Sequence, residues 1–550
     1  MKNYLLIILL LTTQYCLAQQ PNTPANVIDP WDIRIEFEPI IGETAPGLHS
    51  FAYATYGSKW VFIGGRTNGL HGLNSNSNFE TEFANNRVVV IDTIDWQWAS
   101  ASLTQLPQTM ADPLSSTNMQ YWANDTMLYM VGGYGWDSIA EGFVTYPTLS
   151  AINIQGIINA VETGDSLRPH IRQYADTNLA VCGGELIQMD SLYYLVMGHK
   201  FAGRYSNPAQ MLFTQRYTEA IRHFSIVDNG DTLYIANFGE LVDTNNFHRR
   251  DLNAVRLDYG DTSKIAVLGG VFQKNVDLPF TRTVLFDGQT AYTEVDTFYT
   301  QRFNQYTNAH ILINGDDVWG PGGANAYGII MLGGMGTYNY DEMAYYAYDS
   351  LVPFSKTISM VRINEQQALG DATNNIGPYS LGLMPGYLGS NAVFIKGSGF
   401  ASTSNGAILM QELPNFETIP RKFVGYLFGG IRGTAPNNAV SSANDTIYRI
   451  YYRCLSGASV NELPGISNKS IYPNPGNGSA TLALTLDKPQ KINATICNIN
   501  GAEVQTICNG NLSNGSQNIP INAANLPTGL YLVKIETPGG VGFLKYAVVK

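Results

Sequence analysis

The stretch DTMLYMVGGYG, residues 125 to 135, decides the fold, because it ends an apolar strand on two glycines and the chain repeats this pattern. Short runs of aliphatic and aromatic residues predict buried strands. A glycine pair directly afterwards predicts a place where backbones approach closely, since glycine has no Cβ. The similar stretches are KWVFIGGRT at 59, YLVMGHK at 194, KIAVLGGVF at 264, GIIMLGGMG at 328 and VGYLFGGIR at 424.

A second mark precedes each of these six stretches, namely a polar residue that opens an apolar strand. We interpret these polar residues as structural groups that satisfy the backbone of the inner strands. They are His49, Asn118, Asn178, Asn253, Asn308 and Asn391. Each unit reads as four short strands, since RVVVID at 87 and WQWAS at 96 follow the first pair. Repeated four-stranded units predict a β-propeller. The double glycines at 183, 322 and 539 lack the preceding strand pair, and we interpret them as loop or tail features.

The repeat resembles that of the kelch propellers, in which an Arg- or His-bearing inner strand leads to an apolar strand, Gly-Gly and an aromatic strand. The best copy combines His49 with Gly64-Gly65 and the tryptophans at 96 and 98. The resemblance covers residues 30 to 455 loosely, and the repeats are longer than the ~50 residues typical of kelch units. It implies a six-bladed kelch-like β-propeller.

The first strand has a special role in this scheme. WDIRIEFEP, residues 31 to 39, alternates like a strand, whereas the last unit ends without a fourth strand. We therefore expect residues 31 to 39 to complete the last blade and close the ring.

The N-terminus predicts export. MKNYLLIILLLTTQYCLA, residues 1 to 18, reads as a signal peptide cleaved between Ala18 and Gln19, because its apolar run is too short to cross a bilayer. The bulky Tyr15 before Cys16 argues against lipidation. No later stretch is long and apolar enough to form a transmembrane segment.

Charge divides the rest of the chain. Residues 19–465 hold 25 basic and 41 acidic residues, whereas residues 466–550 hold six lysines and three acidic residues. The acidic larger part argues against nucleic acid as a partner, and NELPGISN at 461 reads as the linker. The expected fold class is all-β, with the kelch-like propeller over 19–465 and a small Ig-like β-sandwich over 466–550. A hairpin centred on Asn500-Gly501 would pair Cys497 with Val504, so no disulfide to Cys508 is predicted.

The tail contains three motifs in order: YPNP at 472, LPTGLY at 526 and the strand from Lys545 to Lys550. Together they closely resemble the C-terminal sorting domain of cargo for the type IX secretion system of Bacteroidetes. The resemblance implies the type IX machinery as a partner and a secreted or cell-surface location. The implied sorting residues are Tyr472, Pro473, Asn474, Pro475, Gly529, Tyr531 and Lys545.

The tripeptide Asp-Ser/Thr-aliphatic recurs at 92, 125, 137, 165, 190, 231, 349 and 445. Turn chemistry explains the pattern, because Asp and Ser/Thr side chains bond their own backbone just before a strand. The tripeptide also resembles the O-glycosylation acceptor of periplasmic proteins of Bacteroidetes, so glycosylation is a possible consequence.

Propellers bind ligands at the mouth of the channel, on loops that follow the inner strands. Aromatic rings beside arginine suit sugars or peptide carboxylates. The binding candidates are Arg66, Tyr134, Trp136, His199, Arg249, Arg250, Arg302 and His310. No catalytic residue, metal or cofactor is predicted.

The expected function is recognition of a glycan or protein partner. The alternative is a carbohydrate-active enzyme similar to a sugar epimerase or mutarotase, and a purely structural extracellular component is a third possibility. A copper oxidase of the galactose-oxidase kind is disfavoured, because the spacing of Cys182, His199 and His310 does not resemble that family. SIVDNGDTL at 225 departs from the sialidase box and reads as a hairpin turn.

Overall fold

The computed structural model describes residues 33–40, 45–71, 78–206, 213–288, 300–301, 303–315, 326–340, 346–364, 373–375, 381–413, 421–437, 440–454, 463, 465–498, 503–538 and 540–549. Several features named above lie outside these residues. They are Ala18 and Gln19, Trp31, Arg302, Asn500-Gly501, the double glycine at 322, Gly539 and Lys550.

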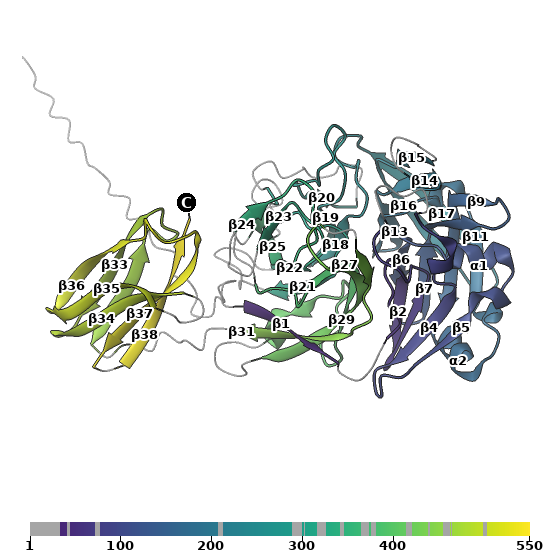
Figure 1. Ribbon diagram of the computed structural model, residues 1–550. Coiled ribbons are helices and arrows are strands. Elements are labelled where there is room, and N and C mark those ends of the chain that lie inside the picture. The colour runs from purple at the N-terminus through teal and green to yellow at the C-terminus, as the bar shows by residue number, and fades with distance from the viewer. Residues whose placement is uncertain are drawn as a thin grey trace, which may run out of the picture.

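The described chain is all-β, as expected, and six of its sheets are mainly antiparallel, with short hairpins inserted between some of their strands (Figure 1). The first sheet is β2 (Ala52–Tyr56), β3 (Lys59–Ile63), β4 (Arg87–Asp92) and β5 (Trp98–Ser102). The second is β6 (Gln120–Ala123), β7 (Met127–Val131), β10 (Thr148–Asn153) and β11 (Ile171–Ala175). The third is β12 (Glu185–Met189), β13 (Leu192–Val196), β16 (Ala220–Asp228) and β17 (Leu233–Val242).

The fourth sheet has three strands among the described residues: β18 (Asn253–Tyr259), β19 (Thr262–Leu268) and β20 (Val284–Phe286). The fifth is β21 (His310–Gly315), β22 (Ala326–Leu332), β25 (Ile358–Asn364) and β26 (Thr373–Asn375), with β28 (Ile408–Leu409) parallel to β21. The sixth is β27 (Tyr387–Lys396), β29 (Lys422–Gly433), β31 (Tyr448–Cys454) and β1 (Ile33–Pro39), with β30 (Ser441–Ala443) beside β29.

Hairpins and short helices connect these strands. The hairpins are β8 (Tyr134–Asp137) with β9 (Gly142–Thr145), β14 (His199–Gly203) with β15 (Phe213–Tyr217), and β23 (Tyr338–Tyr340) with β24 (Tyr346–Tyr348). The helices are η2 (Thr81–Phe83), η3 (Leu103–Gln105), α1 (Gln108–Leu114), α2 (Ile154–Thr163), η4 (Arg168–His170), η5 (Thr177–Leu179) and η7 (Met410–Glu412).

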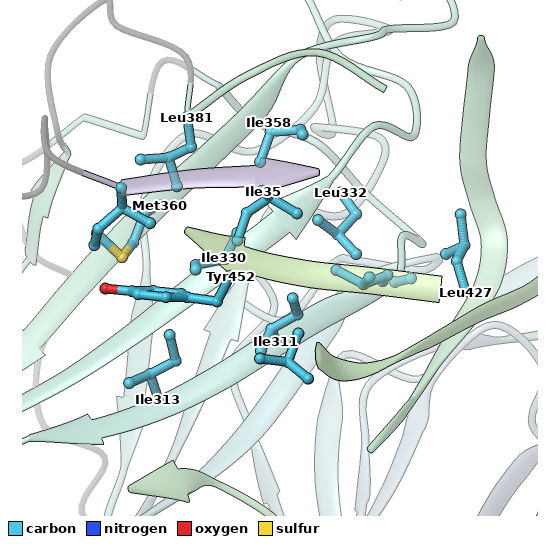
Figure 2. Close-up of a cluster of buried hydrophobic side chains, with 14 of the residues drawn as sticks. Ile35, Ile311, Ile313, Ile330, Leu332, Ile358, Met360, Leu381, Leu427 and Tyr452 are labelled. Carbon is cyan, nitrogen blue, oxygen red and sulfur yellow. The ribbon is translucent and has the colours of Figure 1, made fainter. Parts of the chain in front are cut away.

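The expectation that the first strand completes the last sheet is confirmed, because β1 pairs antiparallel with β31. Figure 1 shows β1 beside β31 and β29, although most of the described chain separates them in sequence. Ile35 lies opposite Tyr452, and both side chains are buried in the cluster shown in Figure 2. On the other face of β1, Glu36 pairs with Arg453 at 2.9 Å. Burial and charge therefore both fix the register.

The double glycines lie where one sheet touches the next. The φ of Gly132 is 70°, and a Cβ at this position would lie 2.0 Å from the carbonyl oxygen of Val181. The N–H of Gly133 donates to that same carbonyl at 2.9 Å. Gly333 repeats this arrangement, with its φ of 60° and a Cβ position 2.1 Å from the oxygen of Leu388. Only glycine fits such a position, so the repeated pair is a sheet-to-sheet contact.

Backbone hydrogen bonds between residues at or just before the first strands join five of the six neighbouring pairs of sheets. We call the six residues that form these bonds the linking residues, and all have positive φ: Ser50, Asn118, Gly183, Asp251, Thr307 and Asn391. In each bond the N–H of the first residue donates to the carbonyl of the second. The bonds are Asp251 to Gly183 at 2.6 Å, Gly183 to Asn118 at 2.9 Å, Asn118 to Ser50 at 3.1 Å, Ser50 to Asn391 at 3.4 Å and Asn391 to Thr307 at 2.6 Å. The first sheet is therefore bonded to the sixth as well as to the second.

The third sheet corrects one part of the sequence interpretation. Asn178 does not open a strand; it lies in η5, whose cap is the Asp176 side chain. Gly183 takes the linking position instead, and β12 begins two residues later. The double glycine at 183 is thus the start of an inner strand rather than a loop feature.

Two further sheets follow these six (Figure 1). They are β32 (Ile466–Tyr472), β33 (Ser479–Leu486) and β36 (Gly515–Asn522), and β35 (Glu503–Leu512), β34 (Gln490–Cys497), β37 (Gly529–Thr537) and β38 (Gly540–Val548). Leu463, in the expected linker, is buried in their shared core. The expected pairing of Cys497 with Val504 is wrong, because bulges place Cys497 opposite Glu503 and Cys508 opposite Ala494.

Candidate functional site

Three of the binding candidates line one small pocket between the first two sheets. Arg66 comes directly after the double glycine that follows β3, and Tyr134 and Trp136 lie in β8, directly after the double glycine that follows β7. The segment at Ser116 and Thr117 lies between them: the Ser116 carbonyl accepts the Gly65 N–H at 2.8 Å, and the Thr117 carbonyl accepts the Tyr134 N–H at 2.8 Å. The remaining lining residues are Phe79, Thr81, Ala84, Ser115, Thr117, Gly135 and Phe143.

The Arg66 guanidinium supplies the charge of this pocket. It donates to the Asn68 side-chain oxygen at 3.1 Å and to the carbonyl of Glu80 at 3.0 Å, and it lies 5.1 Å from the centre of the Phe79 ring. No carboxylate among the described residues forms an ion pair with it. Arg66 is only 6% exposed, and burial lowers its pKa to about 10. The charge of Glu80 acts on this guanidinium in the opposite direction but forms no ion-pair contact with it, so the buried arginine remains suited to an anionic ligand.

Aromatic rings form the walls. The Tyr134 hydroxyl donates to the carbonyl of Gly203 at 2.7 Å, so this group holds the β14–β15 hairpin and only its ring lines the pocket. Trp136 remains 37% exposed and meets Phe143 edge to face at 5.3 Å. A partly exposed indole beside a buried arginine can stack on a flat apolar ligand face.

His199 lies behind this pocket. Its ring contacts Phe201, which in turn contacts the Tyr134 ring at 5.2 Å. Its Nδ1 lies 2.7 Å from the Gln215 side-chain nitrogen. Burial, helped by the charge of Arg250, lowers the pKa of His199 well below its usual value, so the ring is neutral near pH 7.

Arg249 and Arg250, two further binding candidates, bond to other groups of the protein. Arg249 is fully buried and donates to the carbonyls of Asn246 at 2.8 Å, Gly269 at 3.1 Å and Arg282 at 2.8 Å. Arg250 pairs with Asp251, itself a linking residue. Neither residue lines the pocket.

The last two candidates lie elsewhere. His310 opens β21 in the fifth sheet, and burial lowers its pKa. Arg302 lies outside the described residues.

Sequence reasoning missed two walls of the pocket, Phe79 and Phe143. Phe79 stands two residues before η2, and Phe143 faces inward from β9. Neither follows a double glycine, and no local pattern marks them. Across the described residues, no group of three His, Cys, Asp or Glu side chains could hold a metal ion.

The tail motifs meet at the last strand. The Asn474 amide donates to the Lys545 carbonyl at 2.8 Å, and its side-chain oxygen accepts the Ala547 N–H at 2.9 Å. In the second motif, the Tyr531 hydroxyl donates to the Pro527 carbonyl at 3.0 Å, and Tyr531 pairs with Tyr546 in β38. Three motifs distant in sequence thus form one structure around β38.

The predicted turn chemistry is confirmed at three of the Asp-Ser/Thr-aliphatic tripeptides. The carboxylates of Asp92, Asp137 and Asp349 each accept the N–H two residues later, at 3.0, 2.9 and 2.8 Å. The aliphatic residues there, Ile94 and Leu351 among them, are largely exposed. These tripeptides are therefore accessible surface turns.

Comparison with known proteins identifies the tail. Residues 470–549 match the family described as secretion system C-terminal sorting domain. This domain marks proteins that type IX secretion exports, so the protein is destined for the cell surface or the extracellular space. Within the described residues, no helix has the length and apolar character needed to cross a membrane.

The comparisons with solved structures are more distant. A fungal alcohol oxidase of the AA5 family, solved in complex with copper, is 8% identical, with a TM-score of 0.36 and coverage of 94% of this chain and 99% of that chain. YjhT is 12% identical, with a TM-score of 0.40 and coverage of 75% of this chain and 98% of that chain. No curated protein matches the chain.

Proposed function

We propose that this exported chain is a binding protein whose first six sheets form a kelch-like β-propeller followed by an Ig-like sandwich. Its ligand is a glycan or protein that presents a carboxylate, and the ligand binds beside Arg66. The observation that carries this proposal is the pocket in which an unpaired, buried guanidinium lies among aromatic rings.

The hydrogen bonds between the linking residues support the propeller. They connect the first four sheets in chain order, the fifth sheet to the sixth, and the sixth to the first through the bond from Ser50 to Asn391. The fourth and fifth sheets are joined by the Asn308 N–H, which donates to the Asn253 side-chain oxygen at 3.0 Å. The pairing of β1 with β31 gives the sixth sheet its outer strand from the opposite end of the chain. Both features are expected when a row of sheets closes into a ring without open edges.

The chemistry of the pocket supports the ligand class. Arginine presents several N–H donors in a plane and binds carboxylates with two parallel hydrogen bonds. Trp136 offers an exposed ring at the rim, which suits the apolar face of a sugar or a peptide side chain. An acidic sugar or the C-terminal carboxylate of a peptide satisfies both groups.

The test is to titrate the secreted protein with soluble neutral and acidic glycans and short peptides, and to follow each by calorimetry and anomer-resolved NMR. Acidic ligands should bind, and Trp136→Ala should weaken binding at least tenfold. Trp98→Ala is the matched control, because Trp98 is 46% exposed but lies on β5, outside the pocket. Equal losses in both variants, or no preference for acidic ligands, would contradict the proposal. Changed sugar signals would instead reveal an enzyme.

A further inference from the structure

A second arginine lies against one wall of the Arg66 pocket. The central guanidinium carbon of Arg204 lies 4.9 Å from the centre of the Phe143 ring, which lines the pocket. Arg204 comes directly after Gly203, whose carbonyl accepts the Tyr134 hydroxyl at 2.7 Å. Arg204 is therefore held beside the pocket at two points, through its backbone neighbour and through its own side chain.

The pairing of β8 with β9 brings Trp136 to the same wall. Trp136 lies opposite Phe143 in this hairpin, and side chains that lie opposite each other share one face of a sheet. The two rings meet edge to face at 5.3 Å, and the indole remains 37% exposed. An accessible indole and a guanidinium thus contact one aromatic ring.

A row of three pocket rings joins the two arginines. Arg66 lies 5.1 Å from the centre of the Phe79 ring. Phe79 meets Tyr134 edge to face at 5.1 Å, and Tyr134 stacks on Phe143 at 5.6 Å. Arg204 lies at the other end of this row. Each guanidinium therefore has its own ring beside it, and the two offer separate positions for anionic groups.

No carboxylate neutralises Arg204. Within the part of the chain that the structure describes, its guanidinium forms neither a hydrogen bond nor an ion pair. Residues 199–217, which form its own hairpin, contain no Asp or Glu. The one acid in the strands β8 and β9 is Asp137, which follows Trp136 and so points to the other face. The Asp137 carboxylate accepts the N–H of Ile139 at 2.9 Å. The charge of Arg204 is thus free to meet a ligand.

We propose that Arg204 binds a second acidic group of the ligand, and that the ligand is an acidic oligosaccharide with a carboxylate on each of two sugars. Arg66 binds one carboxylate and Arg204 binds the other, because the planar guanidinium matches a carboxylate with two parallel hydrogen bonds. The Trp136 indole receives the apolar face of a sugar. This inference rests on the proposed function and names the ligand class of the same pocket.

The position of the indole favours a sugar acid over an acidic peptide. A sugar acid carries its carboxylate at the edge of a rigid ring, so stacking of the ring also fixes the place of the carboxylate. Because Trp136 and Arg204 contact the same Phe143 ring, the edge of a stacked sugar lies near the guanidinium. An acidic peptide carries its carboxylates on flexible side chains, which lose conformational entropy when they are ordered.

The test follows binding of three probes to the secreted protein by calorimetry. Galacturonic acid has one carboxylate, digalacturonic acid has two, and glutamylglutamate is the acidic peptide. We expect digalacturonic acid to bind at least about tenfold more tightly than galacturonic acid, because it makes one more charged contact. Arg204→Gln should remove this advantage and leave the affinity for galacturonic acid within about twofold of the parent value.

Arg216→Gln is the matched control. Arg216 is an exposed arginine of the same hairpin, but it lies opposite Lys200, on the face turned away from Phe201 and the pocket. This variant should bind both acids like the parent. Circular dichroism checks that each variant is folded. If Arg204→Gln is not, Arg204→Lys replaces it and should bind digalacturonic acid at least about threefold more weakly, because lysine lacks the planar fork.

The outcomes separate this inference from the proposed function. If neither acid binds to the folded parent protein, both are wrong. If the two acids bind equally tightly, or if Arg204→Gln and Arg216→Gln lose the same affinity for digalacturonic acid, only the role of Arg204 is wrong. Tighter binding of glutamylglutamate than of digalacturonic acid would overturn the assignment of the ligand to an oligosaccharide.

Discussion

Replacing Gly132 by alanine should destabilise the protein far more than replacing Gly164 by alanine, although the two glycines have similar backbones. Their φ angles are 70° and 78°. A Cβ at 132 would lie 2.0 Å from the Val181 oxygen, whereas a Cβ at 164 would meet nothing within 4 Å. The two substitutions therefore share the backbone strain and differ in the approach of the next sheet.

The magnitudes follow from the contacts. At Gly164 the cost is that of a left-handed backbone for alanine, about 1 kcal/mol. At Gly132 the Val181 carbonyl must also move, although it accepts the Gly133 N–H at 2.9 Å. Losing that hydrogen bond costs about 1 kcal/mol, and forcing an atom into a packed interior costs about 1–3 kcal/mol. We expect the free energy of unfolding to fall by about 3–5 kcal/mol in Gly132→Ala.

The assay is urea denaturation of both variants and the parent protein, followed by tryptophan fluorescence. Circular dichroism before denaturation checks that each variant is folded. If the two midpoints fall equally, the close approach between sheets does not explain the double glycine. If Gly132→Ala does not fold at all while Gly164→Ala does, the direction of the reasoning is supported.

Glu185→Gln should raise the free energy of unfolding increasingly between about pH 4.5 and pH 8, because only the parent must ionise a carboxyl whose pKa rises to about 8 on folding. Denaturation at about pH 5 and pH 9 measures this difference. Asn474→Ala should lose two hydrogen bonds to the last strand, destabilise the tail by about 1–3 kcal/mol and reduce export, as immunoblots of medium and cells would show. Deleting residues 466–550 should trap the remainder in the periplasm, and unchanged appearance outside the cell would contradict sorting by the tail. Intact mass of protein from its own host should exceed that of the bare chain if the Asp-Ser/Thr turns carry glycans; an equal mass would remove that idea.

The sheets could be predicted from the sequence because each repeat carries a local sequence signal. An apolar strand with Gly-Gly at or near its end marks the second strand of five sheets, and Gly198 marks the second strand of the third sheet. The role of residues 33–39 could also be inferred, since a lone alternating strand at one end of the chain needs a partner and the last unit lacks one. Asn178 misled the interpretation because a polar residue before an apolar run also suits the 3₁₀ turn that it occupies.

The sites were harder to predict because they depend on approach between sheets. Phe79 reaches Arg66 only because the structure returns the chain beside β3, and nothing in the residues around Phe79 signals this.

The residues that directly follow each double glycine, or Gly198 in the third sheet, differ in chemistry between the two halves of the repeats. In the first three sheets these residues are Arg66, Tyr134 and His199, and in the last three they are Val271, Met335 and Ile431. Five of the six form a β-bridge to the segment that precedes the first strand of their sheet, so their positions are equivalent. Equivalent backbone positions thus carry polar or aromatic groups in one half of the repeats and aliphatic groups in the other. Tyr134 and His199 form hydrogen bonds within the fold, so Arg66 is the member of this set whose chemistry the proposed ligand explains.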